Sequence, residues 1–379
     1  MIYLDNAATS WPKPDAVGAA MVAALAEAGN PGRSAHGPAL AAGRILLATR
    51  RLAAELFGAS PDRVVLTGSA TMGLNLAIAG LLSPGDHAVT TDLEHNSVLR
   101  PLYAARQRGV ALTIVRSERG QVGPDAVAAA LRPETRAVVL NHASNVLGTV
   151  QPLDEIAAVC AARGVPLIVD AAQTAGALPV DLAGVPVAAL ACGGHKALHG
   201  PAGTGLLVLA EGVLPKPLLV GGTGFDSFAE TMPADLPEAL EAGTPNVPGF
   251  AGLNAALELH LADPAGPPAA ALAAAARLRA GLAGLGCWAA PDVVGWGVPV
   301  VSGSVLDRAG RVIDPGEVAD QLWQRAGIAV RAGYHCAPLV HRHYGSEATG
   351  LVRFSPGPTT TDAEIDAAIA TVRAIHEAS

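Results

Sequence analysis

The chain has 379 residues, half of them hydrophobic and only 3% aromatic, with a formal net charge of −8 at pH 7. This length is enough for two domains that each bury a core. The acidic balance, with no basic block, excludes an extended nucleic-acid surface, because phosphate contacts need clustered Lys or Arg.

The amino terminus lacks the basic and apolar regions of a signal peptide, and no run of about 18 uncharged apolar residues predicts a membrane span. We therefore expect a cytoplasmic protein without membrane contact. The four cysteines, at positions 160, 192, 287 and 336, have no paired CxxC spacing, so a disulfide framework or structural zinc site has little support.

From about residue 38 onward, helical and strand-like segments alternate. The pattern predicts helices over 40–57, 74–82 and 153–162, and strands over 63–67, 87–91, 110–115, 137–141, 165–170, 187–191 and 205–209. Strands that are apolar throughout, separated by helices, indicate a mainly parallel sheet covered on both faces. The fold class is therefore α/β, with a doubly wound large domain.

A domain change is expected near the Ala/Pro/Gly-rich stretch 262–274, which is either a linker or the start of a helix. Beyond it, strands are predicted over 298–301, 328–331 and 351–354, and helices over 315–326 and 361–378. This pattern fits a smaller α+β domain. We predict a large domain over 16–260 and a small domain over 261–379. The amino-terminal segment 1–15 is expected to pack with the small domain.

Two segments of the large domain carry candidate chemistry. The apolar run 165–170 ends in Asp170, and the tetrad Gly193-Gly194-His195-Lys196 follows it. A pyridoxal phosphate site needs a lysine amine to hold the aldehyde and a carboxylate to keep the ring nitrogen protonated. An acid at a strand end and a solvated lysine are also common in α/β proteins, so this pair alone leaves both interpretations open.

Other polar residues follow predicted strands. Gly68-Ser69-Ala70-Thr71 opens a helix and is either a phosphate cradle or an ordinary N-cap. His95, Asn145 and Gln173 each lie beyond the carboxyl end of a strand, where α/β sheets bind ligands. A single crevice would thus contain a phosphate cradle at 68–71, the imidazole of His95 for stacking on a ring, and the Asp170 and Lys196 side chains.

With these motifs in view, the chain resembles the class V aminotransferase-like enzymes and, within them, the cysteine desulfurases of the SufS-like group. The resemblance covers nearly the whole chain. It is carried by the segments 3–9, 67–76, 94–99, 144–149, 169–173, 194–196 and 241–246. It implies the pyridoxal phosphate-dependent transferase fold of type I, with a seven-stranded type of sheet, and pyridoxal 5′-phosphate as cofactor.

The resemblance also implies a role for each matching residue. Lys196 would carry the cofactor and move protons, Asp170 would pair with the pyridinium nitrogen, and His95 would stack on the ring. The remaining implied assignments are Gln173 at the phenolic oxygen, Asn145 near ring and substrate, Ala70, Thr71 and His195 at the phosphate, and Ala7 at the substrate. Thr244 would reach the phosphate of the other subunit's cofactor, so a homodimer with shared sites is expected.

One position departs from the family pattern. The family usually has Ser or Thr two residues before the histidine of its lysine motif, whereas this chain has Gly193. A hydroxyl donor to the phosphate is therefore missing. Either Cys192 or a water takes its place, or the cofactor binds less tightly than usual.

Cys336 lies in the segment 330–339, and a free cysteine is more often a buried hydrophobe than a nucleophile. Flanking Arg331 and His335 would favour its thiolate, and the Arg-x-Gly-x-His-Cys-Ala pattern resembles the nucleophile loop of SufS-like desulfurases. A zinc site built from His335, Cys336, His341 and His343 is the alternative, although no recognised ligand spacing supports it. We predict no metal. The loop 338–350 is shorter than in many of these relatives.

Arg353 is the candidate for gripping the substrate α-carboxylate, because a planar guanidinium binds carboxylates in two places. The resemblance implies conversion of L-cysteine to L-alanine, with the sulfur left as a persulfide on Cys336 for an acceptor protein, as in sulfur mobilisation for iron–sulfur cluster assembly. The alternatives are a selenocysteine lyase acting on L-selenocysteine, another C–S lyase, a class V aminotransferase and an inactive scaffold that binds a sulfur acceptor.

Overall fold

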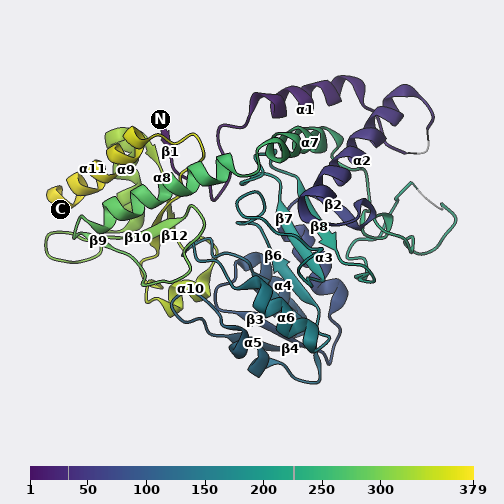
Figure 1. The fold of residues 1–379 in the computed structure, drawn as a ribbon, viewed down its shortest axis with the longest axis horizontal. Coiled ribbons are helices and arrows are strands. Elements are labelled where there is room, and N and C mark those ends of the chain that lie inside the picture. The colour runs from purple at the N-terminus through teal and green to yellow at the C-terminus, as the bar shows by residue number, and fades with distance from the viewer. Residues whose placement is uncertain (33, 225–226) are drawn as a thin grey trace.

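The computed structural model describes residues 1–32, 34–224 and 227–379. Within these ranges, seven strands form the large sheet in the order β2-β8-β7-β6-β5-β3-β4 (Figure 1). The strands are β2 (Val64–Thr67), β3 (His87–Thr91), β4 (Ala111–Val115), β5 (Thr135–Asn141), β6 (Leu167–Asp170), β7 (Ala189–Gly193) and β8 (Gly205–Leu209). Strand β8 is antiparallel to both of its neighbours, β2 and β7. The mainly parallel α/β sheet expected from the sequence is confirmed.

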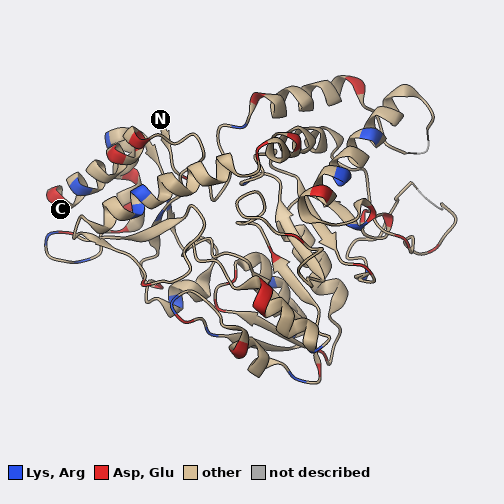
Figure 2. Ribbon diagram, viewed as in Figure 1, with Lys and Arg blue, Asp and Glu red and all other residues tan. Residues whose placement is uncertain are grey.

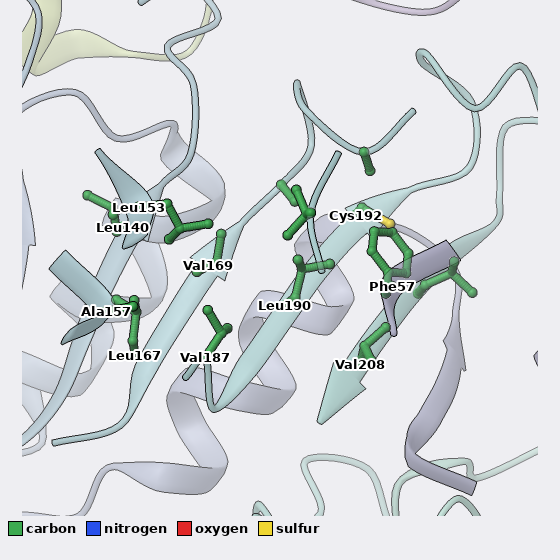
Figure 3. Close-up of a cluster of buried hydrophobic side chains, with 14 of the residues drawn as sticks. Phe57, Leu140, Leu153, Ala157, Leu167, Val169, Val187, Leu190, Cys192 and Val208 are labelled. Atoms are coloured by element: carbon green, nitrogen blue, oxygen red, sulfur yellow. The ribbon is translucent and has the colours of Figure 1, made fainter. Parts of the chain in front are cut away.

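Helices cover both faces of this sheet. They are α1 (Asp15–Glu27), α2 (Gly37–Phe57), α3 (Ala70–Leu81), α4 (Asn96–Gln107), α5 (Pro124–Ala130), α6 (Leu153–Ala162) and α7 (Val247–Ala262). Side chains alternate between the faces of a strand. In β7, Leu190 and Cys192 therefore pack with Phe57 of α2 on one face, as Figure 3 shows, while Ala191 packs against α3 on the other. Burial of both faces explains why these strands are apolar throughout.

The carboxyl-terminal part builds a second core. It contains α8 (Gly266–Ala283), α9 (Pro315–Ala326), α10 (Pro338–His343) and α11 (Asp362–Ala378), with β9 (Trp288–Ala289), β10 (Val301–Val305), β11 (Ile328–Ala329), β12 (Arg331–Gly333) and β13 (Leu351–Phe354). An antiparallel sheet runs in the order β12-β13-β10-β9. Strand β1 (Ile2–Tyr3) pairs in parallel with β11, and Leu4 is buried in the same core. The first residues of the chain thus pack against its last quarter.

Several predicted elements differ from the structure. The strand predicted over 298–301 was wrong, because β10 begins at Val301, after Pro299 has removed a backbone donor. The strand predicted over 328–331 is divided into β11 and β12, and the strand predicted over 187–191 lies two residues later, as β7. In the stretch 262–274, where a linker and a helix start were both open, α8 begins at Gly266, and its prolines occupy the first turn, where missing N–H groups cost nothing. The segment after Cys336 was expected to be a loop, but it contains α10.

Acidic and basic residues are scattered along the helices and loops of both parts of the chain in Figure 2. Among the described residues, no helix combines the length and apolarity needed to cross a bilayer.

Candidate active site

A cavity of about 220 Å³ opens where β5, β6 and β7 end, at Asn141, Asp170 and Gly193. Parallel strands that end at one sheet edge bring their following loops together. The lining residues are Ala7, Ala8, Ser69, Ala70, Thr71, His95, Ser97, Asn141, Ala143, Asn145, Asp170, Ala172, Gln173, Gly193, His195, Lys196, Arg331, His335, Cys336 and Arg353. The structure therefore brings together all the site residues named from the sequence except Thr244.

Asp170 and Lys196 both line this cavity, and burial shifts the pKa of each. Burial raises the pKa of Asp170, while the Ala172 N–H, which donates to Asp170 Oδ1 at 2.9 Å, and the Lys196 charge oppose the rise. Burial is the main cause that lowers the pKa of Lys196 to about 8; the Asp170 charge opposes this shift and the Arg353 charge supports it. A lysine amine that loses its proton near neutral pH can act as a nucleophile or a base.

The first turn of α3 forms one wall of the cavity. Ser69 is the N-cap, and its Oγ accepts the Met72 N–H at 3.2 Å. The other N–H groups of a first turn lack intrahelical partners and favour an anion. The N-cap interpretation is thus confirmed, and Ala70, Thr71 and His195 all line the cavity, so we call this segment with His195 the candidate anion cradle. His195 Nδ1 is buried without a hydrogen-bond partner among the described residues.

Gly193 faces this cradle. A Cβ at this position would lie 3.2 Å from His195 Cδ2 and 4.0 Å from the Ala70 nitrogen. Cys192 points the other way, into the core with Phe57 (Figure 3), and burial raises the pKa of its thiol to about 12. The suggestion that Cys192 replaces the missing hydroxyl is therefore wrong, because neighbouring residues of a strand face opposite sides.

His95 is the N-cap of α4, and its Nδ1 accepts the Ser97 N–H at 3.0 Å. Burial, followed by the Lys196 charge, lowers the pKa of His95 to about 4, so the imidazole is neutral at neutral pH. Gln173 Nε2 donates to the Ala7 carbonyl at 3.1 Å and ties the amino-terminal segment to the cavity wall.

The segment that carries Cys336 has an uncommon backbone. His335 and Cys336 both adopt positive φ angles, 48° and 56°, which cost conformational free energy in residues other than glycine. Two contacts with the large domain hold this turn. Asn145 Nδ2 donates to the His335 carbonyl at 2.8 Å, and the Asn96 N–H donates to the Cys336 carbonyl at 2.7 Å. The exposed Cys336 thiol is thereby fixed at the cavity.

The charge expected on His335 is absent. Its side chain is buried, and burial together with the Arg353 charge lowers its pKa to about 3. The expectation that His335 is a cation favouring the Cys336 thiolate was therefore wrong. Arg331, which is exposed and lines the cavity, is the charged neighbour on this segment.

The histidines considered as zinc ligands contact other groups. His341 Nδ1 lies 2.8 Å from Ser346 Oγ, and His343 Nδ1 lies 2.5 Å from Asp92 Oδ2. No group of three or more His, Cys, Asp or Glu residues in the described part of the chain is arranged to hold a metal ion. The His343–Asp92 contact instead fastens α10 to the loop after β3.

Arg353 is buried beside the cavity, with 2% of its surface exposed. Its Nη2 donates to Asp5 Oδ1 at 2.9 Å, and its Nη1 donates to the Asn145 carbonyl at 3.1 Å. The Nε atom has no partner among the described residues and is available to a carboxylate. Arg331 lies directly opposite Arg353 in the register of β12 and β13, so two cations border one site.

Thr244 does not reach this cavity. It is exposed, in a loop that the partly buried ion pair between Glu241 and Arg50 (2.6 Å) anchors to α2. Two residues that the sequence reasoning missed, Asp5 and Ser97, do contribute to the site. Ser97 lies just beyond His95 after the strand 87–91, whereas Asp5 follows no predicted strand end, and both belong to the matching segments 94–99 and 3–9.

Comparison with known proteins agrees with this geometry. The aminotransferase class-V family model matches residues 2–368. A probable cysteine desulfurase of Methanothermobacter thermautotrophicus is 34% identical over 96% of this chain and 92% of its own length, and a cysteine desulfurase of Cereibacter sphaeroides is 33% identical over 96% and 93%.

The fold has close counterparts among solved structures. The apo structure of the cysteine desulfurase from Thermococcus onnurineus superposes with a TM-score of 0.92, at 28% identity, over 100% of this chain and 95% of that one. Family match, curated relatives and fold agree over nearly the full length. The chain therefore belongs to the aminotransferase class-V family and, within it, to the cysteine desulfurases.

Proposed function

We propose that this protein is a pyridoxal phosphate-dependent cysteine desulfurase that leaves the sulfur of L-cysteine on Cys336. The observation that carries the proposal is one cavity holding an exposed thiol, a desolvated lysine and a buried acid. An aminotransferase has no need of the thiol, and a scaffold that only binds partners has no need of the lysine and acid.

The cavity residues fit the cofactor. The lysine amine suits its aldehyde, the buried carboxylate suits its ring nitrogen, and the α3 cradle with the unpartnered His195 Nδ1 suits its phosphate. The residues proposed to hold it are Lys196, Asp170, Gln173, His95, Asn145, Ala70, Thr71 and His195. When bound, the cofactor supplies an electron sink for the carbon atoms of the substrate.

The protein's own groups position the substrate and move protons. Arg353 offers its unpartnered Nε to the α-carboxylate of cysteine, while its Nη2 donates to Asp5 and its Nη1 donates to the Asn145 carbonyl. Lys196, neutral for part of the time because its pKa is about 8, removes the α-proton and returns a proton to the α-carbon after the C–S bond has broken. Asp170, buried in the cavity, would pair with the ring nitrogen of the cofactor and stabilise positive charge there.

The thiolate of Cys336 attacks the sulfur of the substrate. An S–S bond forms, the Cβ–S bond breaks, and its electron pair stays with the carbon, which takes up a proton to give alanine. The sulfur becomes a persulfide on Cys336. Because Cys336 is exposed, we propose that this sulfur then passes to an acceptor protein or a small thiol.

Replacing Cys336 by serine is the decisive experiment. The Cys336→Ser protein should bind pyridoxal phosphate normally and form no alanine from L-cysteine, because serine does not accept sulfur. Cys160→Ala, a buried cysteine of α6, is the matched control and should keep its turnover. Undiminished alanine formation by Cys336→Ser would refute the assignment. Selenocysteine turnover by the same variant would instead favour a selenocysteine lyase.

We further propose a homodimer whose sites are shared. Two observations support it: Thr244 lies outside its own subunit's cavity, and large apolar side chains are exposed on neighbouring elements. We call these side chains the apolar face; they are Val22 and Leu25 of α1, Leu40 and Leu47 of α2, Leu218, Leu219 and Val220 after β8, and Leu259 of α7. Helix α7 contacts both α1 and α2.

Subunit mixing tests the sharing of sites. Lys196→Ala dimers should be inactive, and Thr244→Ala dimers should bind the cofactor weakly. A mixed dimer should regain one complete site, because the subunit that keeps Lys196 receives Thr244 from its partner. If Thr244 served its own subunit, mixing would restore nothing.

A further inference from the structure

Ser97 is the middle of a chain of three side chains. Its Oγ lies 2.8 Å from Thr71 Oγ1 on α3 and 2.9 Å from His95 Nδ1. The Ser97 N–H also donates to His95 Nδ1, at 3.0 Å. All three residues line the cavity, so the anion cradle and the imidazole before α4 are joined through one hydroxyl group.

The direction of these hydrogen bonds follows from their donors. A backbone N–H can only donate, so His95 Nδ1 carries a lone pair, and the proton of the neutral ring is on Nε2. The Ser97 hydroxyl must then donate to Nδ1 as well. Since the single hydroxyl proton of Ser97 is used, Thr71 is the donor to Ser97 Oγ.

His95 Nε2, on the far edge of the ring, has no hydrogen-bond partner within the described ranges of the chain. Its N–H is therefore available to a molecule in the cavity. A rotation of the ring or a change of tautomer would withdraw this donor, and the contacts that Ser97 makes to Nδ1 oppose both changes.

We propose that Ser97 is a positioning residue, which holds His95 with its proton on Nε2 and couples the orientation of this imidazole to anion binding at Thr71. The coupling is direct, because an anion in the cradle competes with Ser97 for the only hydroxyl proton of Thr71. The inference rests on the proposed function, since the anion is taken to be the cofactor phosphate.

Histidine ring NMR on the apoprotein tests the coupling without the cofactor. In the wild type, titration with inorganic phosphate should shift the His95 ring ¹⁵N resonances, whose starting values report an Nε2–H tautomer. In Ser97→Ala these values should move toward a mixture of tautomers, and the phosphate response should disappear. Ser97→Thr, which keeps the hydroxyl, should restore both signals. If Ser97→Ala fails to fold, Ser97→Cys, which changes the size of the side chain little, replaces it in the same NMR measurement.

Anion affinity gives a second measurement. In the Ser97→Ala apoprotein the Thr71 hydroxyl no longer donates to Ser97, so inorganic phosphate should bind about five to tenfold more tightly, the equivalent of one gained hydrogen bond. Thr135→Ala is the matched control: Thr135 Oγ1 lies 2.8 Å from His87 Nδ1 at the opposite end of the sheet, and its loss should leave the affinity unchanged. An unaltered His95 spectrum and phosphate response in Ser97→Ala would overturn the inference. Failure of the wild type to bind the cofactor would overturn the proposed function instead.

Discussion

A serine at position 193 is expected to improve the binding of pyridoxal phosphate. The φ of Gly193 lies outside the left-handed region, and a Cβ would point into the cradle with only a ring edge at 3.2 Å to displace. Gly193→Ser should therefore bind pyridoxal phosphate several-fold more tightly, through about 1 kcal/mol from one added hydrogen bond. Titration of the apoprotein measures the change.

Gly194 provides the matched control for this substitution. A Cβ there would lie 2.3 Å from Thr204 Oγ1 and 3.0 Å from Leu253 Cδ1, so Gly194→Ser should destabilise the fold rather than improve binding. Equal affinities for the wild type and Gly193→Ser would show that this position does not limit phosphate binding.

Asp5 is expected to act through Arg353. Removing its charge in Asp5→Asn leaves the buried guanidinium without its only ion pair among the described residues, which loosens the edge that faces the substrate. The KM for L-cysteine should rise about tenfold or more, with a smaller change in kcat, because the lost interaction orients the substrate. A fall in kcat at constant KM would contradict this role.

At the scale of elements, Glu94 links the ends of β3 and β5. Its Oε1 accepts the Thr91 hydroxyl at 2.8 Å and the Asn141 N–H at 3.0 Å, and its Oε2 is buried without a partner among the described residues. Burial raises the pKa of Glu94 from 4.5 to about 8, and the Asp170 and Asp92 charges add to the rise. The hydrogen bonds from Thr91 and Asn141 oppose it without cancelling it. The strand ends that carry the site are thus joined by a protonated acid.

The raised pKa of Glu94 makes the folding stability depend on pH. Between pH 4.5 and about 8 the unfolded chain releases the Glu94 proton while the folded chain retains it, so folding stability falls as pH rises through this window. Glu94→Gln does not titrate. Its free energy of unfolding relative to the wild type should therefore increase by a few kcal/mol, roughly 1.4 kcal/mol per pKa unit, between pH 5 and pH 8. Denaturant unfolding at several pH values measures this difference. A constant difference across this range would mean that Glu94 is ionised in the fold.

The accuracy of the sequence prediction also varies by element. The strands His87–Thr91 and Gly205–Leu209 and the helix Leu153–Ala162 were predicted to the residue, because their apolar patterns match their burial. Helix α10 was missed because six residues, three of them basic or histidine, show no periodicity. The strand near Val298 was misplaced because a continuous apolar run does not mark where pairing begins.

The site was predictable only in part. Strand-end position identified Asp170, His95 and Asn145, since parallel strands fix where such residues meet. The charge state of His335 depends on its burial, and the face of the sheet on which the Cys192 side chain lies depends on the strand pleat. Residue spacing in the sequence reports neither. The contacts of Asp5 and Ser97 join segments brought together only by the fold.

At the scale of the whole molecule, the apolar face predicts the oligomeric state. Its members include Leu25 and Val220, with exposed fractions of 71% and 78%. Arginine at both positions should convert the proposed dimer into a monomer, because desolvating two guanidinium groups opposes association. Sedimentation should then show half the mass of the wild type, and the cofactor should bind more weakly because the proposed contact from the other subunit's Thr244 is lost.

Trp323 of α9 provides the control, since it is 47% exposed in the carboxyl-terminal part, away from the apolar face. Trp323→Arg should leave the mass and the cofactor affinity unchanged. A monomeric wild type would contradict the shared site.

The pairing of the chain's beginning with its last quarter has a consequence for synthesis. Asp5 bridges Ser355, and its carboxylate holds Arg353, so the substrate-binding wall joins residues about 350 positions apart. On the ribosome, the large sheet can form while the carboxyl-terminal part is still being made. The nascent chain therefore contains Lys196 and the segment 68–71 before it contains Cys336, and the cavity is complete only after the carboxyl-terminal part has been made.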